Sequence, residues 1–248
     1  MKASDESGIS QARCIALTQE HRGHGVSTAA YFLGRVLVEQ GLRVLVVDLT
    51  DRRGRLAGFF AHSTVRNLVL WGPPVPRPHE LGALLEQGRK ETAGKADVIL
   101  LDVDAVLLER AGGFALGLDY VVTVVAPAES GLHAADRLAE RLGLESTDAR
   151  MGVMYSRVDG PAAAELPART EQRTLPVIGH FPADYLLAGG DAYSLKGSAP
   201  SIPHDAYIHA LARVAQRLTR LVPLTRQMPL VGIETHQPPR NASSAQSN

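Results

Sequence analysis

The sequence predicts an α/β fold: a doubly wound, mainly parallel β-sheet with helices on both faces. Short runs rich in Val, Ile and Leu alternate with longer amphipathic stretches, the pattern of strands that are buried on both faces and joined by crossover helices. The 248 residues are 45% hydrophobic, which is enough to fill a core of ordinary size. A glycine-containing loop also follows the first apolar run and precedes a helical stretch, which is where such folds place an anion site.

Six apolar runs are predicted to be the strands of the sheet: Cys14–Thr18, Arg43–Leu49, Val98–Asp102, Tyr120–Val125, Gly152–Tyr155 and Val177–Phe181. Four stretches place apolar residues three and four apart, as helices that pack on a sheet do. They are Thr28–Gln40, His79–Glu91, Leu132–Leu142 and His204–Leu221. The proline-rich segment Gly72–Pro78 is predicted to be a loop within the same domain.

These elements predict one α/β domain over residues 12–222, between a flexible N-terminus, residues 1–11, and a disordered polar tail, residues 223–248. Lys plus Arg and Asp plus Glu both number 26, so no basic surface for nucleic acid is expected. No segment resembles a signal peptide or reaches the roughly 18–20 apolar residues of a membrane span. With its single cysteine, Cys14, the chain is expected to be cytoplasmic and to reach the inner membrane only through partners.

The loop after the first strand is the candidate phosphate-binding element. Unpaired backbone N–H groups and the helix dipole converge at such a loop. In the phosphate-loop pattern a glycine is followed by Lys and then Ser or Thr, whereas here Gly25 is followed by Val26 and Ser27. The candidate nucleotide contacts are Gly23, Gly25, Val26, Ser27, Thr28 and Arg22, the last as a replacement for the missing positive charge.

The valine predicts impaired phosphoryl transfer. Val26 offers no donor to the phosphates, and removal of one such electrostatic contact typically lowers the rate by about 10²–10³. The backbone amides, with Ser27 as a magnesium ligand, would still bind a nucleotide with reduced affinity. Two alternatives stay open: a tight strand-to-helix turn that binds nothing, and a metal site on His21 and His24.

Two aspartates are candidate catalytic residues because each lies at the end of a predicted strand. Asp48 and Asp102 should both project at the carboxyl edge of the sheet, where open α/β sheets bind their ligands. In an intact site they would polarise the attacking group and order magnesium, with Asp102 and Ser27 as the metal ligands. Alternatively, both aspartates cap the turns that follow their strands. Arg52 and Arg53 either contact phosphate or begin a solvated helix.

A family resemblance, which runs from about Arg13 to Leu221, becomes specific at the second predicted strand. The run Arg43–Asp48, continued by an Arg-containing turn, resembles the second aspartate motif of the bacterial tyrosine kinases, cytoplasmic relatives of the MinD/ParA ATPases. Asp48 and Arg52 match this motif, and Thr50 stands at its second aspartate. The segment Gly72–Leu81 is similar to the family's Gly-x-x-Pro-Pro-Asn-Pro-x-Glu-Leu-Leu segment.

The resemblance extends over most of the predicted domain. Asp97–Asp102 resembles the family's Walker B strand, and Met151–Ser156 resembles a later strand, with Ser156 where an Asn that contacts the nucleotide is common. His21 stands at the position of the signature lysine of MinD/ParA proteins, so both loop lysines are missing. The tail also has no tyrosine cluster, because all six tyrosines lie in the body of the chain.

The resemblance implies a P-loop NTPase-like domain that takes ATP or ADP with Mg²⁺. Loss of the lysines implies a catalytically impaired regulatory or scaffold subunit of bacterial exopolysaccharide (capsule or cellulose-type) biosynthesis and export. The implied partner is a membrane-embedded synthesis or export component, or its cytoplasmic regulator, and a homodimer is expected. One alternative is an active MinD/ParA-type ATPase that positions a membrane-associated complex. The other is an interaction module that uses no nucleotide.

Overall fold

The computed structural model describes residues 11–20, 23–50, 54–61, 63–144, 150–158, 166, 175–182 and 205–222. The strands are β1 (Arg13–Thr18), β2 (Val44–Leu49), β3 (Leu68–Trp71), β4 (Val98–Val103), β5 (Tyr120–Val125), β6 (Met151–Ser156) and β7 (Val177–Phe181). The helices are α1 (Val26–Glu39), α2 (Gly54–Ala61), α3 (Leu81–Thr92), α4 (Ala105–Arg110), α5 (Glu129–Arg141) and α7 (Asp205–Leu221), with short 3₁₀ turns η1 (Pro78–Glu80) and η2 (Gly113–Leu116).

The strands form one seven-stranded sheet in the order β3-β2-β4-β1-β5-β6-β7. Every neighbouring pair is parallel, which confirms the predicted doubly wound α/β class. All six predicted strands are present. The additional strand, β3, has only four residues and lies at one edge of the sheet.

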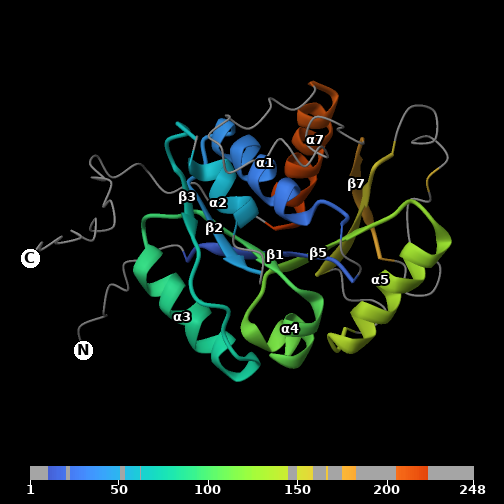
Figure 1. Cartoon of the computed structure of the whole chain (residues 1–248), viewed down its shortest axis with the longest axis horizontal. Coiled ribbons are helices and arrows are strands. Elements are labelled where there is room, and N and C mark those ends of the chain that lie inside the picture. Colours follow the sequence, from blue (N-terminus) through green and yellow to red (C-terminus); the bar gives the residue numbers. More distant parts are fainter. Residues whose placement is uncertain are drawn as a thin grey trace, which may run out of the picture.

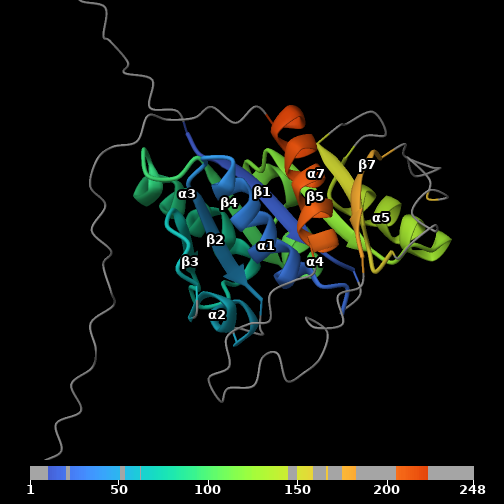
Figure 2. The same ribbon diagram turned by 90° about the horizontal axis from the view of Figure 1, so that it is seen from above.

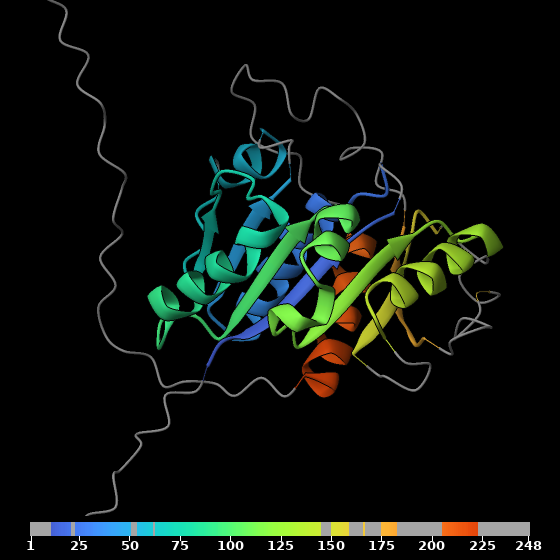
Figure 3. The same cartoon turned by 90° about the horizontal axis from the view of Figure 1, so that it is seen from below.

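Helices cover both faces of the sheet. Figure 1 shows α1, α2 and α7 above the sheet and α3, α4 and α5 below it, and these two layers are seen from above in Figure 2 and from below in Figure 3. Side chains alternate between the faces along each strand. On β1, for example, Ile15 and Leu17 pack in the core beside α1, whereas Cys14 and Ala16 pack in the core beside α5.

The central strand β1 positions the candidate site. It lies between β4 and β5, with Leu17 opposite Asp102 and Thr18 opposite Thr123. The chain leaves β1 through α1 on one face and leaves the adjacent β4 through α4 on the other. Connections that diverge in this way create the crevice in which open parallel sheets bind ligands, at the carboxyl edge.

Two ion pairs hold the opposite, amino ends of the central strands. The Arg43 guanidinium Nη2 lies 2.8 Å from Asp97 Oδ1, and the Arg43 backbone N–H donates to Asp97 Oδ2 at 2.8 Å. The hydrogen bond with Asp97 is the main cause of a raised Arg43 pKa. Similarly, Asp119 accepts from the Cys14 backbone N–H at 2.8 Å and from Arg13 Nη1 at 2.7 Å. These contacts join β2 to β4 and β1 to β5 at positions just ahead of the first paired residues of the strands.

The helices agree with the predicted stretches to within a few residues. The difference that affects the candidate site is at α1, which begins at Val26, two residues before the predicted helix. Two short helices, the eight-residue α2 and the six-residue α4, were not among the four predicted helical stretches. In the described part of the chain, no helix combines the length and the apolar character that a membrane span needs.

Cys14 is fully buried, and desolvation raises the pKa of its thiol to about 12, so the thiol remains protonated and acts as a small apolar group.

We expect Asp97→Asn to lower the free energy of unfolding by about 3–5 kcal/mol, because it leaves the Arg43 guanidinium buried without its carboxylate. Urea unfolding followed by circular dichroism measures this loss. The control is Glu86→Gln, which removes an exposed carboxylate that pairs with Arg89 and should change the free energy by no more than about 1 kcal/mol. Equal effects of the two variants would show that the buried pair does not hold the strands.

Candidate functional site

The loop from β1 into α1 turns at two glycines. Gly23 has φ 97° and Gly25 has φ 82°, both in the left-handed region that side chains other than glycine rarely adopt. Inside the loop, the Gln19 side-chain carbonyl accepts a hydrogen bond from the backbone N–H of His24 at 3.1 Å. The predicted glycines are therefore required by the backbone conformation that brings the chain from the sheet to the helix.

No described side chain caps the N-terminus of α1. Gly25 is the N-cap residue, it offers no side-chain cap, and the first turn of the helix has no acidic residue. The first backbone N–H groups of a helix have no partner within the helix, and the helix dipole makes this end positive. The end of α1 therefore has the backbone chemistry of an anion site.

The residues predicted to contact a nucleotide occupy this helix start, but their side chains differ in exposure. Val26 is the first residue of α1 and is only 2% exposed, packed in the core beside the sheet. Ser27 is half-buried and Thr28 is buried. Two residues named in the sequence analysis, His21 and Arg22, lie outside the described residues, as do Arg52 and Arg53. The lysine position is thus occupied by an apolar core side chain.

The two candidate carboxylates are neighbours in the sheet. Asp48 on β2 is directly opposite Asp102 on β4, and each is 2% exposed. Both follow by two residues a side chain that packs in the core beside α1, namely Val46 and Leu100, so strand alternation places both aspartates on the α1 face. Asp48 Oδ1 also accepts from the backbone N–H of Thr50 at 3.0 Å and from its hydroxyl at 2.7 Å. Asp48 therefore caps a turn as well as facing α1.

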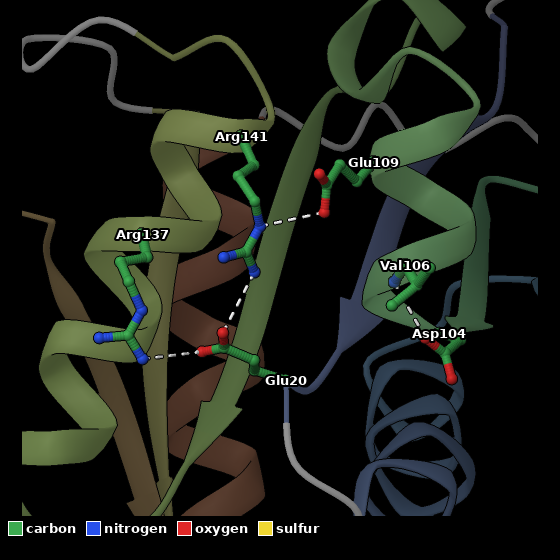
Figure 4. Close-up of polar contacts among 6 residues, drawn as sticks. All are labelled: Glu20, Asp104, Val106, Glu109, Arg137 and Arg141. Atoms are coloured by element: carbon green, nitrogen blue, oxygen red, sulfur yellow. Dashed lines mark hydrogen bonds and ion pairs between the residues drawn. The ribbon is translucent and has the colours of Figure 1, made fainter.

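Two other polar residues near the carboxyl edge have structural partners. Asp104 is the N-cap of α4, and its Oδ1 accepts from the Val106 backbone N–H at 2.9 Å (Figure 4). Ser156, at the end of β6, is buried, and its hydroxyl donates to the Val125 carbonyl on β5 at 3.3 Å. In the described conformation the Ser156 hydroxyl bonds to the sheet.

A cluster of charges joins the loop to two helices, as Figure 4 shows. Glu20 lies 3.5 Å from Arg137 and 3.2 Å from Arg141, both on α5. Arg141 Nε lies 3.0 Å from Glu109 on α4. The two arginines and two glutamates balance in charge. We call Glu20, Glu109, Arg137 and Arg141 the Glu20 cluster; it ties the start of the loop to the face of the sheet opposite α1.

A third arginine contacts the loop from a different element. Arg157 directly follows β6, and its Nη2 donates to the carbonyl oxygen of Gly23 at 2.7 Å. Sequence reasoning did not identify Arg157 or the Glu20 cluster. The only signal in the sequence was that Arg157 follows Ser156, a position already matched to a nucleotide contact.

Two buried hydroxyls lie at the base of the loop. Thr18 and Thr123 are opposite each other on β1 and β5, and neither hydroxyl has a hydrogen-bond partner although both are buried. Buried polar groups normally find a partner in protein or ordered water. Thr18 is the last residue of β1, so one of these unpaired hydroxyls belongs to the residue that starts the loop.

The start of α1 thus combines backbone N–H groups of the kind that suit an anion with a valine at the usual lysine position, and Asp48 and Asp102 lie on the α1 face of the sheet. The described residues contain no group of three or more His, Cys, Asp or Glu side chains placed to hold a metal. A divalent cation here would take further ligands from a bound phosphate, as magnesium usually does.

Solved structures identify the fold. The MinC:MinD cell division complex of Aquifex aeolicus aligns with a TM-score of 0.63 and 20% identity over 90% of this chain and 100% of the other. MinD of Pyrococcus horikoshii, complexed with Mg-ADP, aligns with a TM-score of 0.57 and 20% identity over 85% of this chain and 97% of the other.

A protein described as a plasmid partition protein of Borrelia burgdorferi, bound to AMPPNP, aligns with a TM-score of 0.59 and 16% identity over 85% of this chain and 99% of the other. No protein-family model matches the chain, and the search of curated proteins found no match. The chain therefore has the fold of MinD/ParA-type P-loop ATPases.

We expect Glu20→Gln to loosen the loop with little loss of global stability. The variant removes the carboxylate that contacts Arg137 and Arg141, and ion pairs at the protein surface contribute only about 0–1 kcal/mol each. Amide hydrogen exchange at Gly23–Gly25 should become faster, because local opening needs less free energy. The control Glu129→Gln changes an exposed residue of α5 and should leave this exchange unchanged. Unaltered exchange in Glu20→Gln would contradict the anchoring role.

Proposed function

We propose that this protein binds ATP or ADP with Mg²⁺ at the loop before α1 and acts as a regulatory or scaffold subunit with little or no hydrolysis. The observation that carries the proposal is the combination at α1: a helix N-terminus after Gly25 that no described side chain caps, and a buried valine in place of the lysine. The backbone supplies binding, and the missing ammonium group limits catalysis.

The residues present fit a magnesium-bound nucleotide. Helix N–H groups suit the phosphates, and the Ser27 hydroxyl and the Asp102 carboxylate are oxygen donors of the kind that magnesium prefers. Ser27 is half-buried at the start of α1, and Asp102 faces the same helix. Bound magnesium would offset phosphate charge, while Asp48 would orient a water or hydroxyl group. Two solved structures of this fold are described as holding Mg-ADP and AMPPNP, which supports the choice of ligand.

The proposed setting is bacterial exopolysaccharide biosynthesis and export, of the capsule or cellulose type. It rests on the resemblance to bacterial tyrosine kinases, especially in Gly72–Leu81. In the structure this segment runs from β3 through η1 into α3. The proposed partner is a membrane-embedded component of the export system or its cytoplasmic regulator, which would recruit the protein from the cytoplasm to the inner membrane. The proposed single domain covers residues 12–222, and the predicted flexible ends, apart from residue 11, lie outside the described residues.

A second candidate function is an active MinD/ParA-type ATPase that positions a membrane-associated complex. The observation in its favour is that Asp48 and Asp102 are both retained and adjacent on the α1 face. This function requires a substitute for the lysine, and it predicts a homodimer that forms when ATP is added. Light scattering with ATP and with ADP, together with phosphate release, separates it from the regulatory function.

We expect ATP with Mg²⁺ to raise the thermal unfolding midpoint, because a ligand that binds only the folded state stabilises it. Val26→Lys should tighten ATP binding by about tenfold or more, since a charge-assisted hydrogen bond contributes about 1.5–3 kcal/mol. Titration calorimetry measures the affinity. Turnover should remain low in both proteins, because Thr50 still replaces the second aspartate.

Three outcomes would contradict the proposal. An identical midpoint with and without ATP or ADP favours the interaction module that uses no nucleotide. Unchanged affinity in Val26→Lys means that the loop is not a phosphate cradle. Rapid hydrolysis by the wild type that disappears in Asp48→Ala identifies an active ATPase instead.

A further inference from the structure

The residue after β6 has an unusual backbone conformation. Arg157 has φ 59°, in the left-handed region that is uncommon for residues with a side chain. Such conformations persist where the surrounding structure enforces them, and they are common at ligand sites. Here the conformation accompanies a specific contact, because the guanidinium group reaches the carbonyl oxygen of Gly23 in the loop.

Among the described residues, no carboxylate balances the charge of Arg157. Of the three described arginines that contact the loop, Arg137 and Arg141 pair with Glu20, whereas Arg157 binds a neutral carbonyl. No carboxylate of the described residues lies within ion-pair distance of Arg157. The side chain is exposed, and only one of the five N–H donors of a guanidinium group is used in the contact with Gly23.

The position of Arg157 suits a phosphate contact. The strands β6 and β1 end at the same edge of the parallel sheet. Arg157, which follows β6, therefore reaches the loop from an element other than α1. Gly23 and Gly25 bracket the turn that leads to the positive helix end. A planar guanidinium fork pairs with two phosphate oxygens at once, and the loop itself has a valine at the lysine position.

We propose that Arg157 supplies a positive charge that Val26 cannot supply, by binding the phosphates of a nucleotide held at the N-terminus of α1. The inference rests on the proposed function, since it names a further binding residue of that same site. Arg157 donates to the Gly23 carbonyl through one N–H group, and its remaining donors would bind the phosphates. A cation would then reach the loop from the end of β6, whereas the lysine position of the loop holds Val26.

The test compares binding of ATP, ADP and adenosine, with Mg²⁺ present, by titration calorimetry. Arg157→Asn removes the charge and keeps a residue that tolerates the left-handed conformation. It should weaken ATP and ADP binding by about 10- to 100-fold, the range for a lost charged hydrogen bond, and adenosine binding by less than about twofold. Arg157→Lys should retain part of the affinity, because the ammonium group keeps the charge.

The chain offers a matched control. Arg217 on α7 is exposed, and its Nη1 donates to the backbone carbonyl of Val177 at 2.6 Å, the same type of contact as that of Arg157. Arg217→Asn should bind all three ligands as the wild type does. Arg157→Gly, which adopts the left-handed conformation without strain, should fold normally and lose ATP affinity as Arg157→Asn does, so a folding defect in one variant does not decide the result.

The two proposals fail in different ways. No binding of ATP or ADP to the wild type refutes the proposed function. Binding of ATP to Arg157→Asn and Arg157→Gly with wild-type affinity overturns the role of Arg157 alone. Equal losses for ATP and adenosine also overturn it, because they indicate that Arg157 only shapes the loop or contacts the nucleoside. A loss of affinity for ATP and ADP alone supports the role of Arg157. Added salt should make this loss smaller, as expected for a contact between charges.

Discussion

The parallel register of β2, β4, β1 and β5 is the constraint on which the site depends. Side chains alternate along a strand, so a shift of one residue would move every side chain to the opposite face. In the observed register Asp48 and Asp102 lie side by side and face α1. The pairs Arg43–Asp97 and Arg13–Asp119 hold the amino ends of these strands. Alignment at one edge of the sheet thus determines which groups meet at the other.

The loop before α1 is held mainly by elements that come much later in the chain. Glu20 binds arginines of α5, and the Gly23 carbonyl accepts from Arg157 after β6. A phosphate loop of the usual pattern has its own lysine, but here the corresponding side chain, Val26, is buried in the core. The electrostatics of the site therefore depend on how β6 and α5 pack around β1.

Much of the fold was predictable because strands buried on both faces and amphipathic helices have different periods. All six predicted strands and the four predicted helices are present. The edge strand β3 was not predicted, because it has four residues and directly precedes the proline-rich segment. The helices α2 and α4 were missed because eight and six residues are too few to show helical periodicity. The two aspartates and the loop glycines were identified, because strand ends and glycine-containing turns are local features.

The sequence by itself determined the α/β class, the position of the loop, and the replacement of lysine by Val26, since each follows from residue types along one continuous stretch. Only the tertiary structure decided which charges surround the loop. Glu20 is separated from Arg141 by 121 positions, and Gly23 from Arg157 by 134. No local pattern records contacts between residues so far apart, because folding of the whole sheet is what brings β6 and α5 to the end of β1.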